Sequence, residues 1–196
     1  MVALPKGKYK ETPYFSKAYC PSNPINNLMW RISWREDCMY DTELQDTFRQ
    51  AAKDDILFFF SAFAWCFEPR SNAADKPFIP WAHQERAIID MNEAYMRAMR
   101  DEKRQDVVLD KSRGQGATWM ALMIILHHWL FDPGFSCGIV TETEAKVDSL
   151  RDQDALMFRI AWMIERLPFW MLPKKWDRVT SEHAIFNYDL NSSVVG

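Results

Sequence analysis

The segment between Val107 and Phe131 constrains the fold of this chain more than any other part of the sequence. It begins with the short apolar run Val107–Asp110, passes through a loop that holds Gly114 and Gly116, and ends in a long apolar stretch. The first part predicts a buried parallel strand and the last part a helix. A strand that leads through a glycine-bearing turn directly into a helix gathers backbone N–H groups around the N-terminus of that helix. The order of these parts therefore predicts an anion-binding loop at Lys111–Thr118.

The elements expected around this loop alternate in the manner of α/β proteins. Strand, helix, strand and helix in succession imply right-handed βαβ units and a parallel sheet. The expected helices cover residues 41–67 (capped by Asp41), 82–100, 118–131 and, starting at Thr141 or Thr143, about 141–167 with a break near 151–154. The expected strands cover residues 107–110, 135–140 and 184–190, and a partner strand begins at Val194 after a turn at 191–193.

Two regions follow from this pattern. Residues 1–77 are expected to form an N-terminal part, extended over its first 40 residues and then helical, that packs on the second region. Residues 78–196 would form the first part of an α/β domain with a parallel sheet and flanking helices.

Composition excludes several classes of protein. Apolar residues make up 48% of the chain and the formal charge is only −3, so neither disorder nor a strongly basic nucleic-acid-binding surface is expected. The four cysteines are far apart and indicate free thiols in a reducing compartment. The N-terminus has no apolar core like that of a signal peptide, and the longest apolar runs are too short to span a bilayer. We therefore expect an intracellular protein without a membrane segment.

The loop departs from the usual phosphate-binding pattern G-x-x-x-x-G-K-[ST]. Gly116 matches the second glycine and Thr118 the final hydroxyl residue, but Lys111 replaces the first glycine and Ala117 the usual lysine. A lysine at the start of the loop could still reach across its open face to the β- and γ-phosphates. The hydroxyl of Thr118 would then bind Mg²⁺, and Arg113 would neutralise charge on the γ-phosphate. The alternative is an ordinary solvated turn, because glycine-rich turns are common.

The residues of this loop resemble those of a known family. Lys111-Ser112-Arg113-Gly114-Gln115-Gly116-Ala117-Thr118-Trp119 is similar to the variant phosphate loop of phage terminase large subunits, in which the lysine stands at the start of the loop. The upstream run Pro80-Trp81-Ala82-His83-Gln84 resembles the adenine-recognition element of that family. The resemblance covers about residues 78–196, and only the loop is highly specific.

The resemblance implies a P-loop NTPase fold that binds ATP and Mg²⁺. It assigns the phosphate cradle to residues 111–118, with Lys111 and Arg113 as catalytic groups, Thr118 as the Mg²⁺ ligand, and Gln84 and Trp81 at the adenine. It also implies a motor that moves double-stranded DNA into a procapsid in the cytoplasm of a bacterial host. The implied partners are double-stranded DNA, the portal protein, a small terminase subunit and further copies in a homo-oligomeric ring.

Two features of the family are missing from the sequence. No apolar run ending in Asp-Glu follows residue 118, and no acidic nuclease cluster is present. The chain would then be a fragment that binds nucleotide but hydrolyses ATP poorly, because no residue polarises the attacking water. The alternatives are a fragment of a helicase-like P-loop NTPase and a non-enzymatic scaffold that binds no nucleotide.

Overall fold

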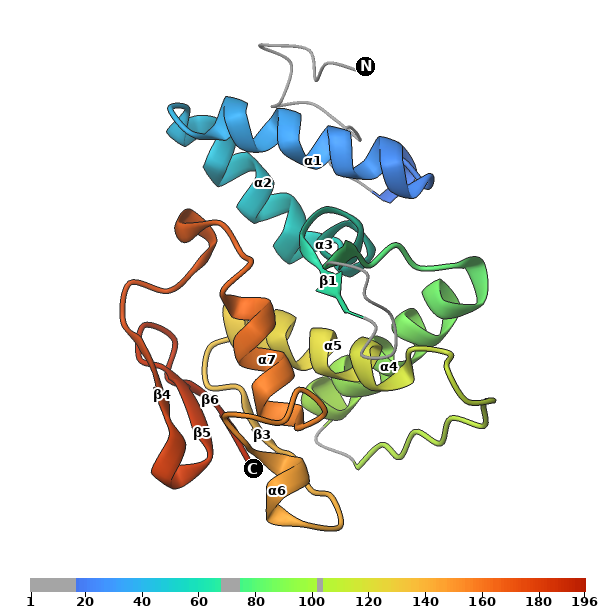
Figure 1. Cartoon of the computed structure of the whole chain (residues 1–196), viewed down its shortest axis with the longest axis vertical. Helices are drawn as coiled ribbons and strands as arrows, with labels where there is room; N and C mark the ends of the chain where they lie inside the picture. Colours follow the sequence, from blue (N-terminus) through green and yellow to red (C-terminus); the bar gives the residue numbers. More distant parts are fainter. Residues whose placement is uncertain (1–16, 68–74, 102–103) are drawn as a thin grey trace.

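The computed structural model of this chain describes residues 17–67, 75–101 and 104–196. This part of the chain is a mixed α/β structure with seven α-helices, a two-stranded sheet and a four-stranded sheet (Figure 1). The α-helices are α1 (Pro24–Cys38), α2 (Thr42–Asp54), α3 (Ile56–Phe63), α4 (Ala82–Asp101), α5 (Ala117–Phe131), α6 (Glu144–Val147) and α7 (Leu156–Ile164). The strands are β1 (Trp65–Cys66), β2 (Lys76–Pro77), β3 (Ser136–Gly138), β4 (Trp176–Val179), β5 (Ala184–Asn187) and β6 (Ser192–Val195). Short 3-10 helices cover Lys17–Tyr19, Phe169–Met171 and Thr180–Glu182.

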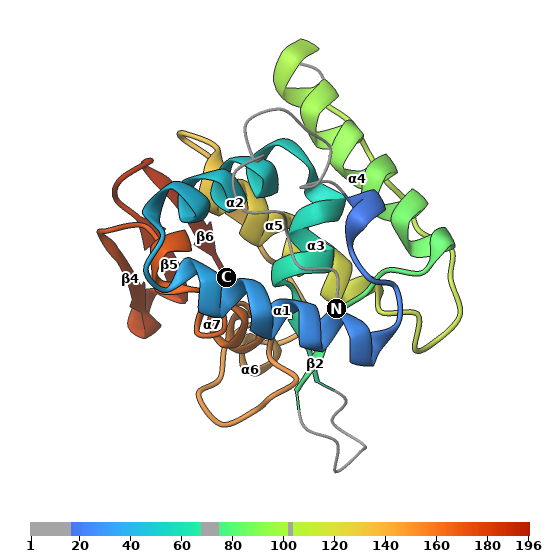
Figure 2. The same cartoon turned by 90° about the horizontal axis from the view of Figure 1, so that it is seen from above.

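The larger sheet has the strand order β3-β6-β5-β4. Only β3 and β6 run parallel, with Cys137 opposite Val194, while β6, β5 and β4 form an antiparallel meander. The expected parallel sheet is therefore limited to one pair of strands. Helix α5 lies between this sheet and α4 (Figures 1 and 2).

Helix α5 is the centre of the molecule. Eleven of its fifteen residues are buried, as expected for a helix that is apolar on every side. The main-chain oxygen of Trp129 accepts hydrogen bonds from Asn187 Nδ2 at 2.8 Å and Ser192 Oγ at 2.7 Å. These two bonds attach the last turn of α5 to strands β5 and β6.

The N-terminal part differs from the sequence prediction in two places. Helix α1 lies where an extended chain was expected; Asn23 caps it by accepting from the N–H groups of Ile25 and Asn26. The single helix predicted for residues 41–67 is divided at Asp55, whose side chain caps the separate helix α3. In both places a capping side chain starts a helix by accepting from its first unpaired N–H groups. Asp41 caps α2, as predicted.

The prediction of a buried strand at Val107–Asp110 is wrong. The segment belongs to neither sheet, and Val107, Val108 and Leu109 are 44%, 91% and 40% exposed. A parallel strand needs neighbours for its N–H and C=O groups. Within the described residues, the parallel neighbour of β3 is β6 instead. Apolar character alone did not bring this segment into the sheet.

The later elements agree better with the sequence. Helix α4, helix α5 and strand β3 lie inside their predicted ranges or extend one residue beyond them, and Thr143 precedes α6 as its N-terminal capping residue. The predicted break near residues 151–154 separates α6 from α7. Strand β4 was not predicted, and β6 starts two residues before the expected Val194. The four cysteines form no disulfide. In the described ranges, no helix has both the length and the apolar character needed to cross a bilayer.

A fully buried arginine joins α1 to the end of α3. Arg31 donates to the main-chain oxygens of Ala64 at 2.8 Å and Ser61 at 2.7 Å, and through Nε to Asn27 Oδ1 at 2.7 Å. Burial, followed by the charge of Arg35, lowers the pKa of Arg31 to about 9, so the guanidinium is still charged at neutral pH. A positive charge at the C-terminus of a helix is favourable because the last carbonyls are unsatisfied.

Replacing Arg31 with Met is expected to lower the free energy of unfolding by about 3 kcal/mol, because buried carbonyls lose charge-assisted hydrogen bonds. Urea unfolding followed by circular dichroism measures this change. Arg97, which is exposed on helix α4, provides the matched control. Its replacement with Met should change the free energy by less than about 0.5 kcal/mol. Equal effects of the two substitutions would contradict the role of Arg31.

His127 makes the stability of the fold depend on pH. Its Nε2 lies 2.9 Å from the main-chain oxygen of Ala52, its Nδ1 is buried without a partner, and burial followed by the charge of His128 lowers its pKa to about 4. In the unfolded chain the pKa of His127 is about 6.5. Between these values only the unfolded chain binds the proton, so stability falls as the pH decreases from about 6.5 to about 4.

We therefore expect the free energy of unfolding to fall by about 2 kcal/mol more in the native protein than in His127→Gln when the pH is lowered from 7 to 4.5. Urea titrations at several pH values measure both slopes. The exposed His83 serves as a control, and His83→Gln should keep the native slope. An unchanged slope in His127→Gln would exclude His127 as the source.

Candidate functional site

The loop before α5 has the backbone geometry of an anion-binding turn. Gly114 and Gly116 have φ values of 79° and 73°, in the left-handed region that glycine adopts without strain. Gly116 is the N-terminal capping residue of α5, and its carbonyl oxygen accepts from the N–H of Met120 at 2.9 Å. The N–H groups of residues 116–119 have no acceptor within the helix. Together with the helix dipole they favour a bound anion.

The second glycine is also required by packing. A Cβ atom built on Gly116 would lie 3.3 Å from Gln84 Nε2 and 3.5 Å from a ring carbon of Phe78. Around Gly114 no atom lies within 4 Å of such a position. Gly116 thus packs closely against the segment that leads into α4, whereas Gly114 faces open space.

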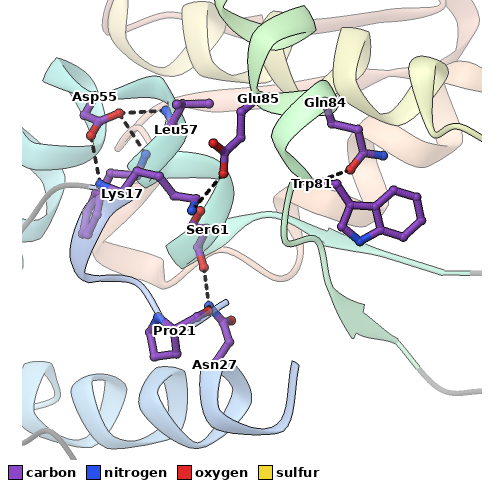
Figure 3. Close-up of polar contacts among 10 residues, drawn as sticks. Lys17, Pro21, Asn27, Asp55, Leu57, Ser61, Trp81, Gln84 and Glu85 are labelled. Atoms are coloured by element: carbon purple, nitrogen blue, oxygen red, sulfur yellow. Dashed lines mark hydrogen bonds and ion pairs between the residues drawn. The ribbon is translucent and has the colours of Figure 1, made fainter. Parts of the chain in front are cut away.

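The start of α4 holds the loop through hydrogen bonds. Gln84 is buried, and its Nε2 donates to the main-chain oxygen of Gln115 at 3.0 Å. Its Oε1 accepts from the main-chain N–H of Trp81 at 2.9 Å (Figure 3). The neighbouring His83 Nε2 lies 3.1 Å from Gln115 Oε1. Two of the upstream residues singled out in the sequence, His83 and Gln84, therefore contact the loop at Gln115.

Two cavities flank the loop, one of about 550 Å³ and one of about 530 Å³. Gly114, Gly116 and Trp81 line the larger one. The smaller one is lined by Lys111, Ser112, Gln115 and Ala117, together with His83. Gln84 borders both cavities, whereas Arg113 and Thr118 line neither of them. The predicted cradle residues are thus divided between two cavities and do not converge on a single pocket.

The larger cavity contains residues that the sequence did not single out. Lys17 forms an ion pair with Glu85 of α4 at 2.9 Å, and its main-chain N–H donates to Asp55 at 3.1 Å (Figure 3). Phe67 contributes aromatic surface, and its ring centroid lies 4.9 Å from that of Trp119, the last residue of the loop motif. No local sequence signal could have found this group, because its members come from distant parts of the chain.

The side chains expected to contact ATP and Mg²⁺ are accessible to solvent. Lys111, Arg113 and Thr118 are exposed, and Trp81, which lines the larger cavity, is 61% exposed. Over the described ranges, no group of three or more His, Cys, Asp or Glu residues is placed to hold a metal ion. A metal ion at the loop would have to be carried by a bound phosphate group, with the Thr118 hydroxyl as the protein group that could touch it.

The difference between the two glycine environments predicts unequal effects of substitution. Gly134 also has a positive φ, of 72°, and open space around it, so Gly134→Ala isolates the backbone strain of about 1 kcal/mol. Gly116→Ala adds the contact with Gln84 and Phe78 and should lower the free energy of unfolding by about 2 kcal/mol. Urea unfolding compares the two variants. An equal loss would show that the loop has room to move away from α4.

Comparison with known proteins does not identify the chain. No protein-family model, no curated protein and no solved structure matches it. The resemblance of residues 111–119 to the terminase loop therefore stays a hypothesis that rests on those residues. The function has to be inferred from the geometry of the loop and its surroundings.

Proposed function

We propose that this chain is the ATP-binding part of a viral DNA-packaging motor of the terminase large-subunit type. In this proposal the loop at residues 111–118 belongs to a P-loop NTPase fold and binds the phosphates of ATP with Mg²⁺. The complete motor would move double-stranded DNA into a procapsid in the host cytoplasm. It would act as a homo-oligomeric ring with the portal protein and a small terminase subunit.

The observation that carries the proposal is the turn at Gly114 and Gly116. Two glycines with positive φ stand directly before a long, buried helix whose first N–H groups are unsatisfied. This arrangement favours phosphate over a neutral ligand, because the N–H groups and the helix dipole act together. Lys111 and Arg113 add two exposed positive charges to the same short loop. An ordinary solvated turn needs neither the second positive-φ glycine nor its packing against Phe78.

The residues of the loop and Trp81 would each contact a different part of the Mg²⁺-ATP complex. The main chain of residues 114–118 binds the phosphate oxygens, Lys111 neutralises their charge and the Thr118 hydroxyl touches Mg²⁺. Arg113 lies on the γ-phosphate and stabilises the charge that develops there during hydrolysis. Trp81, which lines the larger cavity, offers an aromatic face to the adenine.

A second candidate is a scaffold that binds no nucleotide. The exposed segment Val107–Leu109 favours it, because a phosphate loop is ordinarily delivered by a strand inside a sheet. The cavity that contains Lys111 is also separate from the one that contains Gly114 and Gly116. A binding measurement distinguishes the two candidates.

Replacing Lys111 with Ala is expected to raise the dissociation constant for a fluorescent ATP analogue with Mg²⁺ at least about tenfold, because a charge-assisted phosphate contact is lost. A fluorescence anisotropy titration at constant ionic strength measures the change. Lys53, exposed at the end of α2, gives the matched control. Lys53→Ala removes the same charge away from the loop and should bind like the native chain. Binding that does not depend on Lys111, or no binding at all, would sink the proposal.

A further inference from the structure

The hydrogen bonds of Gln84 point to a function other than recognition of the base. We infer that Gln84 is a positioning residue, which acts on bound phosphate by orienting the peptide between Gln115 and Gly116. The inference rests on the proposed phosphate-binding function of the loop. It assigns to α4 a direct part in shaping the phosphate site.

The orientation of the Gln84 amide follows from its partners. The main-chain N–H of Trp81 can only donate, so the atom 2.9 Å away must be Oε1. The carbonyl of Gln115 can only accept, so the atom 3.0 Å away must be Nε2. One N–H of the amide and one lone pair of its oxygen are therefore engaged inside the protein, and the residue is only 6% exposed. A base edge would have to reach the remaining N–H and lone pair of an amide that is almost completely buried.

The bond to Gln115 determines the direction of a donor in the loop. The peptide bond between Gln115 and Gly116 is planar and trans, so its C=O and N–H groups point in opposite directions. Because the carbonyl is turned toward Gln84, the N–H of Gly116 is turned away from α4. This N–H is one of the donors that α5 leaves unsatisfied. Gln84 thus holds one anion-binding N–H in place before any ligand arrives.

Two further contacts support this assignment. Gly116 lies so close to Gln84 Nε2 that a single Cβ atom would fill the gap, which leaves the loop little freedom on that side. His83 engages the side chain of the same residue, Gln115, at 3.1 Å. Consecutive residues of α4 therefore hold the main chain and the side chain of one loop residue. An element that reads the base would not need either contact.

The test compares ligands with and without a base. Isothermal titration calorimetry would measure the binding of Mg²⁺-ATP, Mg²⁺-GTP and Mg²⁺-tripolyphosphate to the native chain and to Gln84→Met. This variant keeps the length of the side chain but loses both its donor and its acceptor. We expect the dissociation constants of all three ligands to rise by the same factor, about fivefold, because the hydrogen bond that orients the loop is lost. The ratio of ATP to GTP affinity should stay unchanged.

Gln45→Met is the matched control, because Gln45 also donates from Nε2 to a main-chain oxygen, that of Cys38, at 2.7 Å. It should leave all three affinities unchanged. Gln84→Asn provides a second variant if Gln84→Met does not fold. It keeps the amide but is too short to reach both Trp81 and Gln115, so the same loss is expected.

A loss of ATP affinity with unchanged tripolyphosphate affinity would overturn the inference, because it would show that Gln84 acts on the base. Unchanged affinity for all three ligands would overturn it as well. Either result leaves the proposed function intact as long as binding still depends on Lys111. A native chain that binds neither ATP nor tripolyphosphate would instead remove the proposed function, and this inference with it.

Discussion

The placement of the loop region depends on the buried guanidinium of Arg31. A charge taken out of water must be compensated locally, and Arg31 finds its compensation at the last carbonyls of α3. The oxygen of Ala64 accepts from Arg31 and also, at 3.0 Å, from the main-chain N–H of Phe78. One carbonyl therefore joins α1, the end of α3 and the segment that leads into α4. Phe78 in turn packs against Gly116, so the α1–α3 contact extends to the edge of the loop.

This chain of contacts explains why the candidate site consists of parts that are far apart in the sequence. Lys17 reaches the larger cavity because Asp55 holds its main chain, and Asp55 is the residue that starts α3. Gln84 reaches the loop because the β1–β2 pair and Phe78 set the start of α4 beside α5. The loop itself supplies charge and N–H groups, and the N-terminal region supplies the walls around it. The same residues that stabilise the fold therefore also shape the cavities.

Local signals in the sequence were reliable where one residue decides the backbone by itself. Asp41 as a helix cap and the two loop glycines act within a few residues, and the structure has both features. Asn23 and Asp55 are signals of the same kind: Asn23 caps α1 just before a proline, and Asp55 caps α3 before a run of apolar residues. The error at Val107–Asp110 is of another kind. Apolar character indicates that a segment can be buried, but the availability of a neighbouring strand decides whether it is.

The sequence by itself determined the long apolar helix, the positive-φ turn in front of it and the two exposed charges in that turn, because these features need only local chemistry. The tertiary structure decided which cavities the loop borders and which residues share them. It also decided that both ends of the Gln84 amide are engaged by main-chain atoms of Trp81 and Gln115. A glutamine at the start of a helix can bond to many partners, and no spacing rule selects among them. The selection is made by the packing of α4 against the loop, where a buried amide must satisfy its donor and its acceptor within the protein.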